Sequence, residues 1–406
     1  MKNIFPNLAV LIPVLFLSSC GISDESVEQK AQRIHDEVLT VDTHCDTPMY
    51  LKMEGFDIGK RNNREEGGGC VDLVRMKEGG MDAMFWAVFT GQGPRDDEGN
   101  QRVKSEALEI LDSIKSAVGR YPELANICYE PADAYSNEKE GKRSIYIGME
   151  NGYPIGMDLG MVETYYDKGV RYITLCHTRN NDICDSSTDE KGPEYDGLSD
   201  FGEEVVQEMN RLGMIIDVSH ISDSSFYDVI RLSKTPIIAS HSCARALCDN
   251  PRNLSDEMLK ELAGNRGVIQ MCILSAYVKE PDPYPARDSA FAALREKYQN
   301  FESLNDEEMG QARRDWSALQ REYPRKLATV SDVVDHIDHI VEVAGIDYIG
   351  IGTDFDGGGG VEGCQDVSEM GNITLELVKR GYTQKEIEKI WGGNFMRVFK
   401  EVRLEK

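Results

Sequence analysis

Positive charge and histidine are scarce in this 406-residue sequence. Lys and Arg number 45 against 71 Asp and Glu, for a formal net charge of −26, and there are seven histidines. The acidic balance argues against nucleic acid and anionic membrane surfaces as partners, because both are themselves negatively charged. The cysteines form no CxxC pair, which argues against a cysteine zinc site. No internal repeat or low-complexity linker divides the chain.

The first 20 residues have the pattern of an export signal. "MKNIFPNLAVLIPVLFLSSC" carries one lysine, then an apolar stretch too short to span a bilayer comfortably, then small residues. Since "LSSC" resembles a bacterial lipobox, we expect 1–19 to be a signal peptide and Cys20 to be lipidated. A plain secretory signal is the alternative. Residues 20–30 would be a lipid-anchored tether that places the protein in a bacterial cell envelope, in the periplasmic or surface leaflet, with the anchor as its membrane contact.

Nine further cysteines lie in the body of the chain. Export permits disulfides, but an odd number cannot all pair internally. Several lie inside apolar runs, as in "QMCIL", where packing as a small hydrophobic side chain is the commoner role.

Short apolar runs, continuous rather than alternating, recur along the body. This pattern is typical of parallel strands buried on both faces. Segments with helical spacing, several opened by a Ser or Asp cap, lie between the runs. The alternation predicts a (β/α)8 TIM barrel, an α/β fold, that occupies 31–406 as one domain. The charged, helical segment 279–330 is predicted to be an insertion between strands 7 and 8. The eight runs are 38–46, 81–90, 143–151, 171–177, 214–220, 235–241, 267–273 and 348–357.

Reactive side chains stand at the ends of these runs, which in such a barrel form the active-site face. His44 and Asp46 are two apart on one strand and therefore face the same side. Taken singly, a histidine there is more often a hydrogen-bonded surface residue, and an Asp is usually a helix cap. Four of seven histidines at strand ends, with three carboxylates, instead indicate a site for two zinc ions. The other candidates are Glu150, His177, His220, His241 and Asp354.

The three remaining histidines have simpler interpretations. His35 is predicted to be an ordinary surface residue of the first helix. His336 and His339 are three apart on a helix and could share a metal, but the apolar spacing of "VVDHIDHIVEVAG" favours a helix packed on the barrel.

Seven motifs, taken together in their order, resemble the membrane (renal) dipeptidase family, zinc metallopeptidases of the amidohydrolase-like barrels. The resemblance covers nearly the whole mature chain. It implies a dipeptidase that uses two Zn²⁺ to hydrolyse dipeptides, and it suggests a homodimer. The motifs are "VDTHCDTP", "GMENGYPI", "YITLCHTRNN", "IIDVSH", "IIASHSCARAL", "NPRNLSDEML" and "IGTDFDG".

The resemblance also implies a role for each matching residue. One zinc would be held by His44 and Asp46, the other by His220 and His241, and Glu150 would bridge them. The ions would lower the pKa of a bridging water, so that hydroxide attacks the peptide carbonyl near neutral pH. The substrate-binding residues would be His177 on the developing oxyanion, Arg252 on the terminal carboxylate and Asp354 as the group that transfers the proton.

The chain departs from the family pattern at Asn151, where the family commonly has glycine. We expect a side chain there to narrow the pocket or to alter the surroundings of Glu150. Two alternatives to a dipeptidase stay open: another amide or ester hydrolase on the same dinuclear barrel, and a non-catalytic lipoprotein that binds a ligand. Arg252 favours a substrate with a carboxylate, and the complete set of metal ligands argues against a non-catalytic protein.

Overall fold

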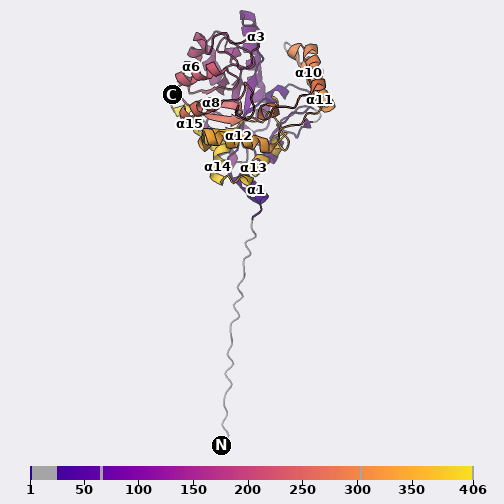
Figure 1. The fold of residues 1–406 in the computed structure, drawn as a ribbon, viewed down its shortest axis with the longest axis vertical. Helices are drawn as coiled ribbons and strands as arrows, with labels where there is room; N and C mark the ends of the chain where they lie inside the picture. The colour runs from indigo at the N-terminus through magenta and orange to yellow at the C-terminus, as the bar shows by residue number, and fades with distance from the viewer. Residues whose placement is uncertain (2–24, 65–66, 302–303, 405–406) are drawn as a thin grey trace.

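Eight parallel strands form the wall of a barrel in this computed structural model, which describes residues 1, 25–64, 67–301 and 304–404 (Figure 1). Neighbours pair in the order β1-β2-β4-β5-β6-β7-β8-β9. Past the end of β9, Phe355 pairs with Cys45 of β1, which brings the last strand back to the first. The predicted (β/α)8 barrel is confirmed, and each predicted run overlaps one strand. The strands are β1 (Val41–Cys45), β2 (Ala83–Phe89), β4 (Arg143–Glu150), β5 (Val170–Thr174), β6 (Ile215–Asp217), β7 (Ile238–Ser242), β8 (Val268–Met271) and β9 (Ile349–Ile351).

One strand was not predicted. β3 (Ala125–Ile127) pairs in parallel with β4 beside the barrel wall. It has three residues, one of them asparagine, so it gives no apolar run in the sequence.

Helices cover the outside of the barrel, and polar caps set where several of them begin. Ser199, Ser222 and Ser255 each accept a hydrogen bond from a backbone N–H in the first turn of the helix that follows. Gly213, in the left-handed region at φ 68°, ends α6. The main helices are α1 (Val27–Glu37), α2 (Leu73–Glu78), α3 (Asp97–Gly119), α4 (Pro131–Lys139), α5 (Gly160–Asp167), α6 (Asp200–Leu212), α7 (Asp223–Leu232), α8 (Asp256–Gly264), α12 (Val330–Val343), α13 (Gly371–Lys379), α14 (Gln384–Glu388) and α15 (Asn394–Leu404).

Aromatic side chains fill the lower part of the barrel and support the site above. Phe85 stacks between Tyr146 and Tyr172, at centroid distances of 4.9 and 5.4 Å. Phe395 of α15 meets Phe85 edge-on at 5.1 Å, so the C-terminal helix packs against this layer. Gly148 makes room for the Tyr172 ring, because a Cβ at this position would lie 2.1 Å from it. The barrel is therefore a packed core with its open end at the carboxyl ends of the strands.

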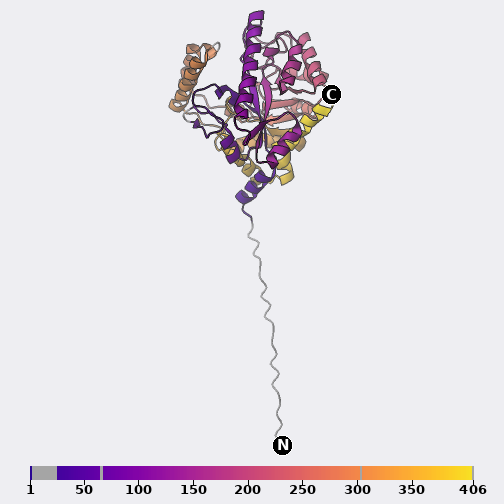
Figure 2. The same cartoon turned by 180° about the vertical axis from the view of Figure 1, so that it is seen from behind.

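The segment 279–330 lies between β8 and β9, as predicted. Two of its helices form a hairpin that projects from the body (Figures 1 and 2). Arg313 attaches the hairpin to the loop after β1: Nη1 donates to the Met49 carbonyl at 3.0 Å, and the guanidinium lies 4.8 Å from the Tyr50 ring. Because that loop follows Asp46, the insertion lies on the same side of the barrel as the strand-end residues. The hairpin helices are α10 (Pro285–Lys297) and α11 (Asp306–Glu322), and the short helix α9 (Ser275–Val278) directly precedes the segment.

The signal peptide and Cys20 lie outside the described residues. Helix α1 begins at Val27, so the last residues of the predicted tether 20–30 are helical. Within the described ranges, no helix is long and apolar enough to cross a membrane. The nine described cysteines are all buried and free of disulfides.

The prediction for His35 was wrong. Its side chain is 3% exposed, with Nδ1 2.7 Å from Thr374 Oγ1 and Nε2 2.8 Å from the Gly79 carbonyl. It joins α1 to the end of α2 and to α13. The helical pattern shows which face is apolar but not which polar residue that face buries.

Candidate metal centre

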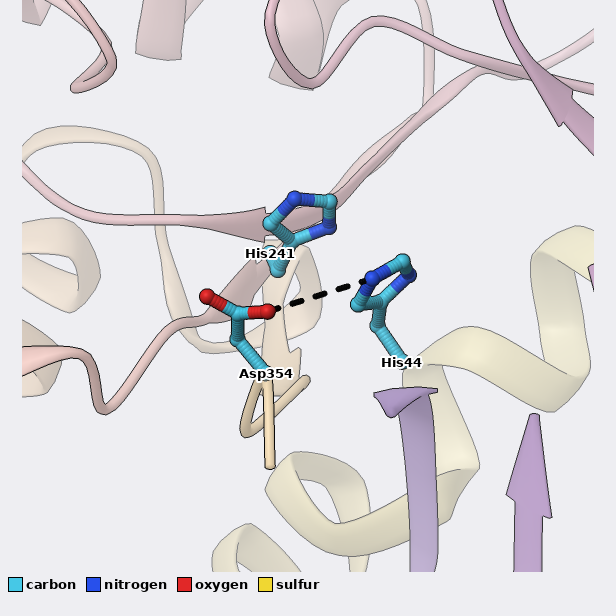
Figure 3. A group of neighbouring side chains, drawn as sticks. All are labelled: His44, His241 and Asp354. Atoms are coloured by element: carbon cyan, nitrogen blue, oxygen red, sulfur yellow. Dashed lines mark ion pairs between the residues drawn. The ribbon is translucent and has the colours of Figure 1, made fainter. Parts of the chain in front are cut away.

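Six strand-end residues meet in three overlapping groups at the carboxyl ends of the strands. In each group, one ligand atom from every residue lies within 4.8 Å of the others, and all six residues are buried. Figure 3 shows one group, in which the Asp354 carboxylate and the two imidazoles face one another. The predicted candidates are thus brought together from five different strands or the loops that follow them. The groups are His44–Asp46–Glu150, Glu150–His220–His241 and His44–His241–Asp354.

The backbone delivers these side chains in two ways. His44 and His241 lie within β1 and β7, and Glu150 is the last residue of β4. His220 and Asp354 each lie three residues past a strand, at φ 73° and 61°. This left-handed conformation is uncommon for residues other than glycine, and it clusters at functional sites.

Glu150 stands between two sets of nitrogen donors. Its Oε1 is 3.0 Å from Nε2 of His220 and 3.5 Å from Nε2 of His241. Its Oε2 is 3.6 Å from Nε2 of His44. Burial alone raises the pKa of Glu150, but His44, His177 and hydrogen bonds from His220 and His241 together bring it well below the usual value. One carboxylate is therefore shared by the two sets.

Tyr172 fixes which nitrogen of His44 is free. Its hydroxyl donates to the Thr43 carbonyl at 3.1 Å, and a carbonyl can only accept. The hydroxyl must therefore accept from His44, whose Nδ1 lies 2.8 Å away. In the neutral ring this leaves the lone pair on Nε2, which is the atom that faces Glu150.

The residues fit metal ions. Asp46, Glu150 and Asp354 are 3–6% exposed. Buried His44 Nε2 and Asp46 Oδ1 have no hydrogen-bond partner among the described residues. Burial and the nearby Glu150 raise the pKa of Asp46 to about 6. Burial, with Cys272 and Asp46, raises the pKa of Asp354 well above its usual value. Imidazoles and carboxylates that lack a counter-cation are the ligands that zinc binds.

His177 and Arg252 lie next to this centre. His177 Nε2 is 3.7 Å from Glu150 Oε1, and its side chain is 20% exposed, against at most 8% for the six residues of the groups. Arg252 donates from Nη2 to the His241 carbonyl at 3.2 Å, while its Nε has no partner among the described residues. His177 thus lies against Glu150 and Arg252 against the backbone of His241, and Arg252 Nε is the atom that lacks a partner.

Tyr277 is a neighbour of Arg252 that the sequence did not reveal. Its ring lies 5.3 Å from the Arg252 guanidinium, and it belongs to α9, just before the insertion. No run or spacing singles it out, because a single tyrosine on a short helix gives no pattern.

The Asn151 side chain hydrogen-bonds to the loops beside Glu150. Its Nδ2 donates to the Thr90 carbonyl at 3.0 Å, and its Oδ1 accepts from Tyr153 N and Asn181 Nδ2, each at 3.1 Å. These partners belong to the loops after β2, β4 and β5. The side chain braces the backbone beside Glu150, which corresponds to altered surroundings and not to a narrower pocket.

The two histidines of helix α12, His336 and His339, have partners outside the metal centre. His336 is 1% exposed; its Nδ1 accepts from Ala244 N at 3.1 Å, and its Nε2 lies 2.8 Å from the Val278 carbonyl. His339 pairs with Asp256 at 2.7 Å. They hold α12 to the barrel, as the apolar spacing indicated.

Comparisons with known proteins give one consistent picture. The family profile described as "Membrane dipeptidase (Peptidase family M19)" matches residues 28–406. Dipeptidase 3 of Mus musculus is 32% identical over 389 residues, which cover 94% of this chain and 68% of that protein. Dipeptidase tcpJ of Claviceps purpurea is 31% identical over 339 residues, 82% of this chain and 69% of that protein.

Among solved structures, the probable dipeptidase PvdM from Pseudomonas aeruginosa superposes with a TM-score of 0.81 at 31% identity, covering 94% of this chain and 99% of that one. A metallopeptidase from Rhodobacter sphaeroides, liganded with a phosphinate mimic of the dipeptide L-Ala-D-Ala, has a TM-score of 0.70 at 22% identity, over 90% and 99%. The latter likeness concerns the fold alone.

Proposed function

Because the chain belongs to the membrane dipeptidase family and is a metal-dependent dipeptidase, we propose that it works with two zinc ions that share Glu150. The main support for this proposal is the position of Glu150, which lies between His44 on one side and His220 and His241 on the other. Because a single carboxylate is within reach of both sets, this position supports one dinuclear site and not two separate sites.

One ion would be held by His44 and Asp46 and the other by His220 and His241, with Glu150 in both coordination shells. When bound, the ions supply Lewis acidity that lowers the pKa of water and polarises a peptide carbonyl. The protein's contribution is to hold these ligands in a buried pocket, where charge interactions are stronger than in water.

The remaining residues act on the substrate. His177, more exposed than the ligands and 3.7 Å from Glu150, donates a hydrogen bond to the carbonyl oxygen as negative charge develops on it. Asp354, with Oδ1 4.0 Å from His44 Nε2, holds the proton taken from water and passes it to the leaving amine. Asp354 and His177 are thus the proposed catalytic residues beside Glu150.

Arg252 sets the length of the substrate. Its guanidinium is buried and lies beside His241, so a carboxylate that pairs with it ends close to the metal centre. The distance between the carboxylate and the hydrolysed bond is then short and fixed, which favours dipeptides. A lactone, a phosphoester or an N-acyl amino acid is the alternative substrate for the same barrel.

We further propose that the protein is exported and anchored through Cys20, with 1–19 removed as a signal peptide. "LSSC" after an apolar stretch supports this, and the anchor would be the membrane contact of a bacterial envelope protein. The homodimer suggested by the family resemblance stays a prediction.

The test is a hydrolysis panel with zinc measured on the same sample. We expect activity on dipeptides, its loss on chelation and its return with zinc. The panel includes lactones, phosphoesters and N-acyl amino acids. Preferred turnover of one of these classes would replace the dipeptide assignment, and an inert panel with less than two zinc equivalents would favour a non-catalytic protein.

A further inference from the structure

Asp217 is a fully buried carboxylate at the end of β6, three residues before His220. Its Oδ1 accepts from the backbone N–H groups of Ser219 at 3.0 Å and Ser240 at 2.8 Å. Its Oδ2 accepts from Ser240 Oγ at 2.6 Å and from Thr174 Oγ1. Four donors converge on these two oxygens: two backbone N–H groups, which can only donate, and two hydroxyl groups. Asp217 is therefore the acceptor at the end of this set of hydrogen bonds.

The direction of the hydrogen bonds follows from this. A serine hydroxyl has one hydrogen, and Ser240 gives it to Asp217. Ser240 Oγ can then only accept from its two other neighbours, His241 Nδ1 at 2.8 Å and Ser219 Oγ at 3.4 Å. With the proton on Nδ1, the lone pair of His241 lies on Nε2, the atom that faces Glu150 and His220.

We propose that Asp217 is a positioning residue of the metal centre, which acts through Ser240 to hold His241 in the tautomer whose Nε2 can bind a metal. The proposal rests on the proposed metal site, because the tautomer matters only if His241 is a ligand. Partners of this kind fix the orientation and the proton of metal-binding histidines, and their loss typically weakens metal affinity about 10- to 100-fold.

The isosteric change Asp217→Asn should reverse the direction of the hydrogen bonds that lead through Ser240 to His241. The two backbone N–H groups at Oδ1 require an acceptor, so the amide oxygen takes that position and Nδ2 faces Ser240 and Thr174. Ser240 Oγ then accepts from the amide and donates to His241 Nδ1. The proton of His241 moves to Nε2, which blocks the metal. We expect one zinc equivalent to bind about 10- to 100-fold more weakly and the other to be retained.

Asp42→Asn is the matched control. Asp42 is also fully buried, accepts two backbone N–H groups, from His44 and Thr353, and accepts the Thr353 hydroxyl. The hydroxyl that donates to Asp42, that of Thr353, makes no hydrogen bond to an imidazole nitrogen among the described residues. Both substitutions disturb a buried carboxylate, but only Asp217→Asn is expected to lower zinc affinity. Equal losses in the two variants would show that Asp217 only supports the fold.

A second pair of variants distinguishes the loss of this hydrogen bond from misfolding of the protein. Ser240→Ala removes the relay and is expected to weaken the same zinc equivalent, whereas Ser240→Thr keeps the hydroxyl and should restore its affinity. The tautomer is read directly from ¹⁵N histidine spectra of the full chain, where the His241 proton is expected on Nδ1 in the wild type and on Nε2 in Asp217→Asn.

The two possible failures are distinguishable. If the wild type binds no zinc, the proposed function fails before Asp217 is tested. If the wild type binds two equivalents and Asp217→Asn binds both with unchanged affinity and an unchanged His241 tautomer, the positioning role of Asp217 is wrong and the metal site stands.

Discussion

Nε2 of His220 and Nε2 of His241 lie 2.9 Å apart, and both lie within 3.5 Å of one oxygen of Glu150. Ser240 leaves the His241 Nε2 as an acceptor, so His220 must either donate a proton to it or share a cation with it. In the second case both lone pairs point to the same metal. Shared coordination of one cation would account for the closeness of the two rings, with His220 in the turn after β6 and His241 within β7.

Arg252→Ala is expected to impair substrates that end in a carboxylate. Loss of a charge-assisted, partly desolvated contact costs about 2–4 kcal/mol, which is roughly 30- to 1,000-fold in kcat/KM. The loss should be much smaller on a dipeptide amide, which has no carboxylate. Kinetics of Arg252→Ala and Arg252→Lys on a dipeptide and on its C-terminal amide check this. Equal losses on both substrates would remove Arg252 as the carboxylate partner.

Tyr172→Phe is expected to weaken the binding of the metal for which we propose His44 as a ligand. The substitution removes only the hydroxyl that accepts from His44 Nδ1, so the ring stack with Phe85 is kept. Zinc affinity measured by chelator competition should fall about 10-fold or more for one equivalent.

Tyr146→Phe is the control for that variant. Tyr146 stacks on the other side of Phe85, and its hydroxyl bonds to backbone groups of Glu130 and Ala134. It should bind zinc as the wild type does. A similar fall in both variants would mean that the tyrosine layer affects the metals only through packing.

His35 makes the folded state sensitive to acid. Burial lowers its pKa below the usual value, so the folded protein keeps the ring neutral where the unfolded chain already binds a proton. Stability from this residue is complete above about pH 6.5 and is lost as the pH falls below it, by up to about 1.4 kcal/mol per pH unit. Urea unfolding of metal-free protein between pH 7 and 5 should show a smaller loss in His35→Gln. Parallel losses in the two proteins would contradict this.

Cys20→Ser is expected to release the protein from the membrane fraction. A lipid-anchored protein depends on its acyl chains for stable attachment. Fractionation of cells that make either form checks this, and an unchanged distribution would argue against lipidation.

The sequence predicts the barrel and its reactive strand ends because both depend on local patterns. Continuous apolar runs mark strands, and the residues that follow them must meet at one face. Asn151 and His35 show the limit. Whether their side chains enter the pocket, the core or a loop network depends on residues far along the chain, such as Asn181 for the first and Thr374 for the second.

The residues that hydrogen-bond to the histidines of the metal centre could not be predicted from the sequence, for the same reason. Tyr172 is 128 residues from His44, and Asp217 reaches His241 through a serine on the neighbouring strand. In the sequence, Tyr172 reads as an apolar strand residue and Asp217 as one polar residue in an apolar run. Only the closed barrel brings them beneath the site.

The zinc content of Glu150→Ala tests the central claim most directly. A carboxylate that belongs to two coordination shells should weaken both sites when it is removed, whereas His220→Ala or His241→Ala should mainly strip one ion. Equilibrium dialysis of the purified proteins against buffered zinc, followed by metal analysis, is predicted to give two equivalents in the wild type, about one in His220→Ala and fewer in Glu150→Ala. Two full equivalents in Glu150→Ala would contradict the shared site.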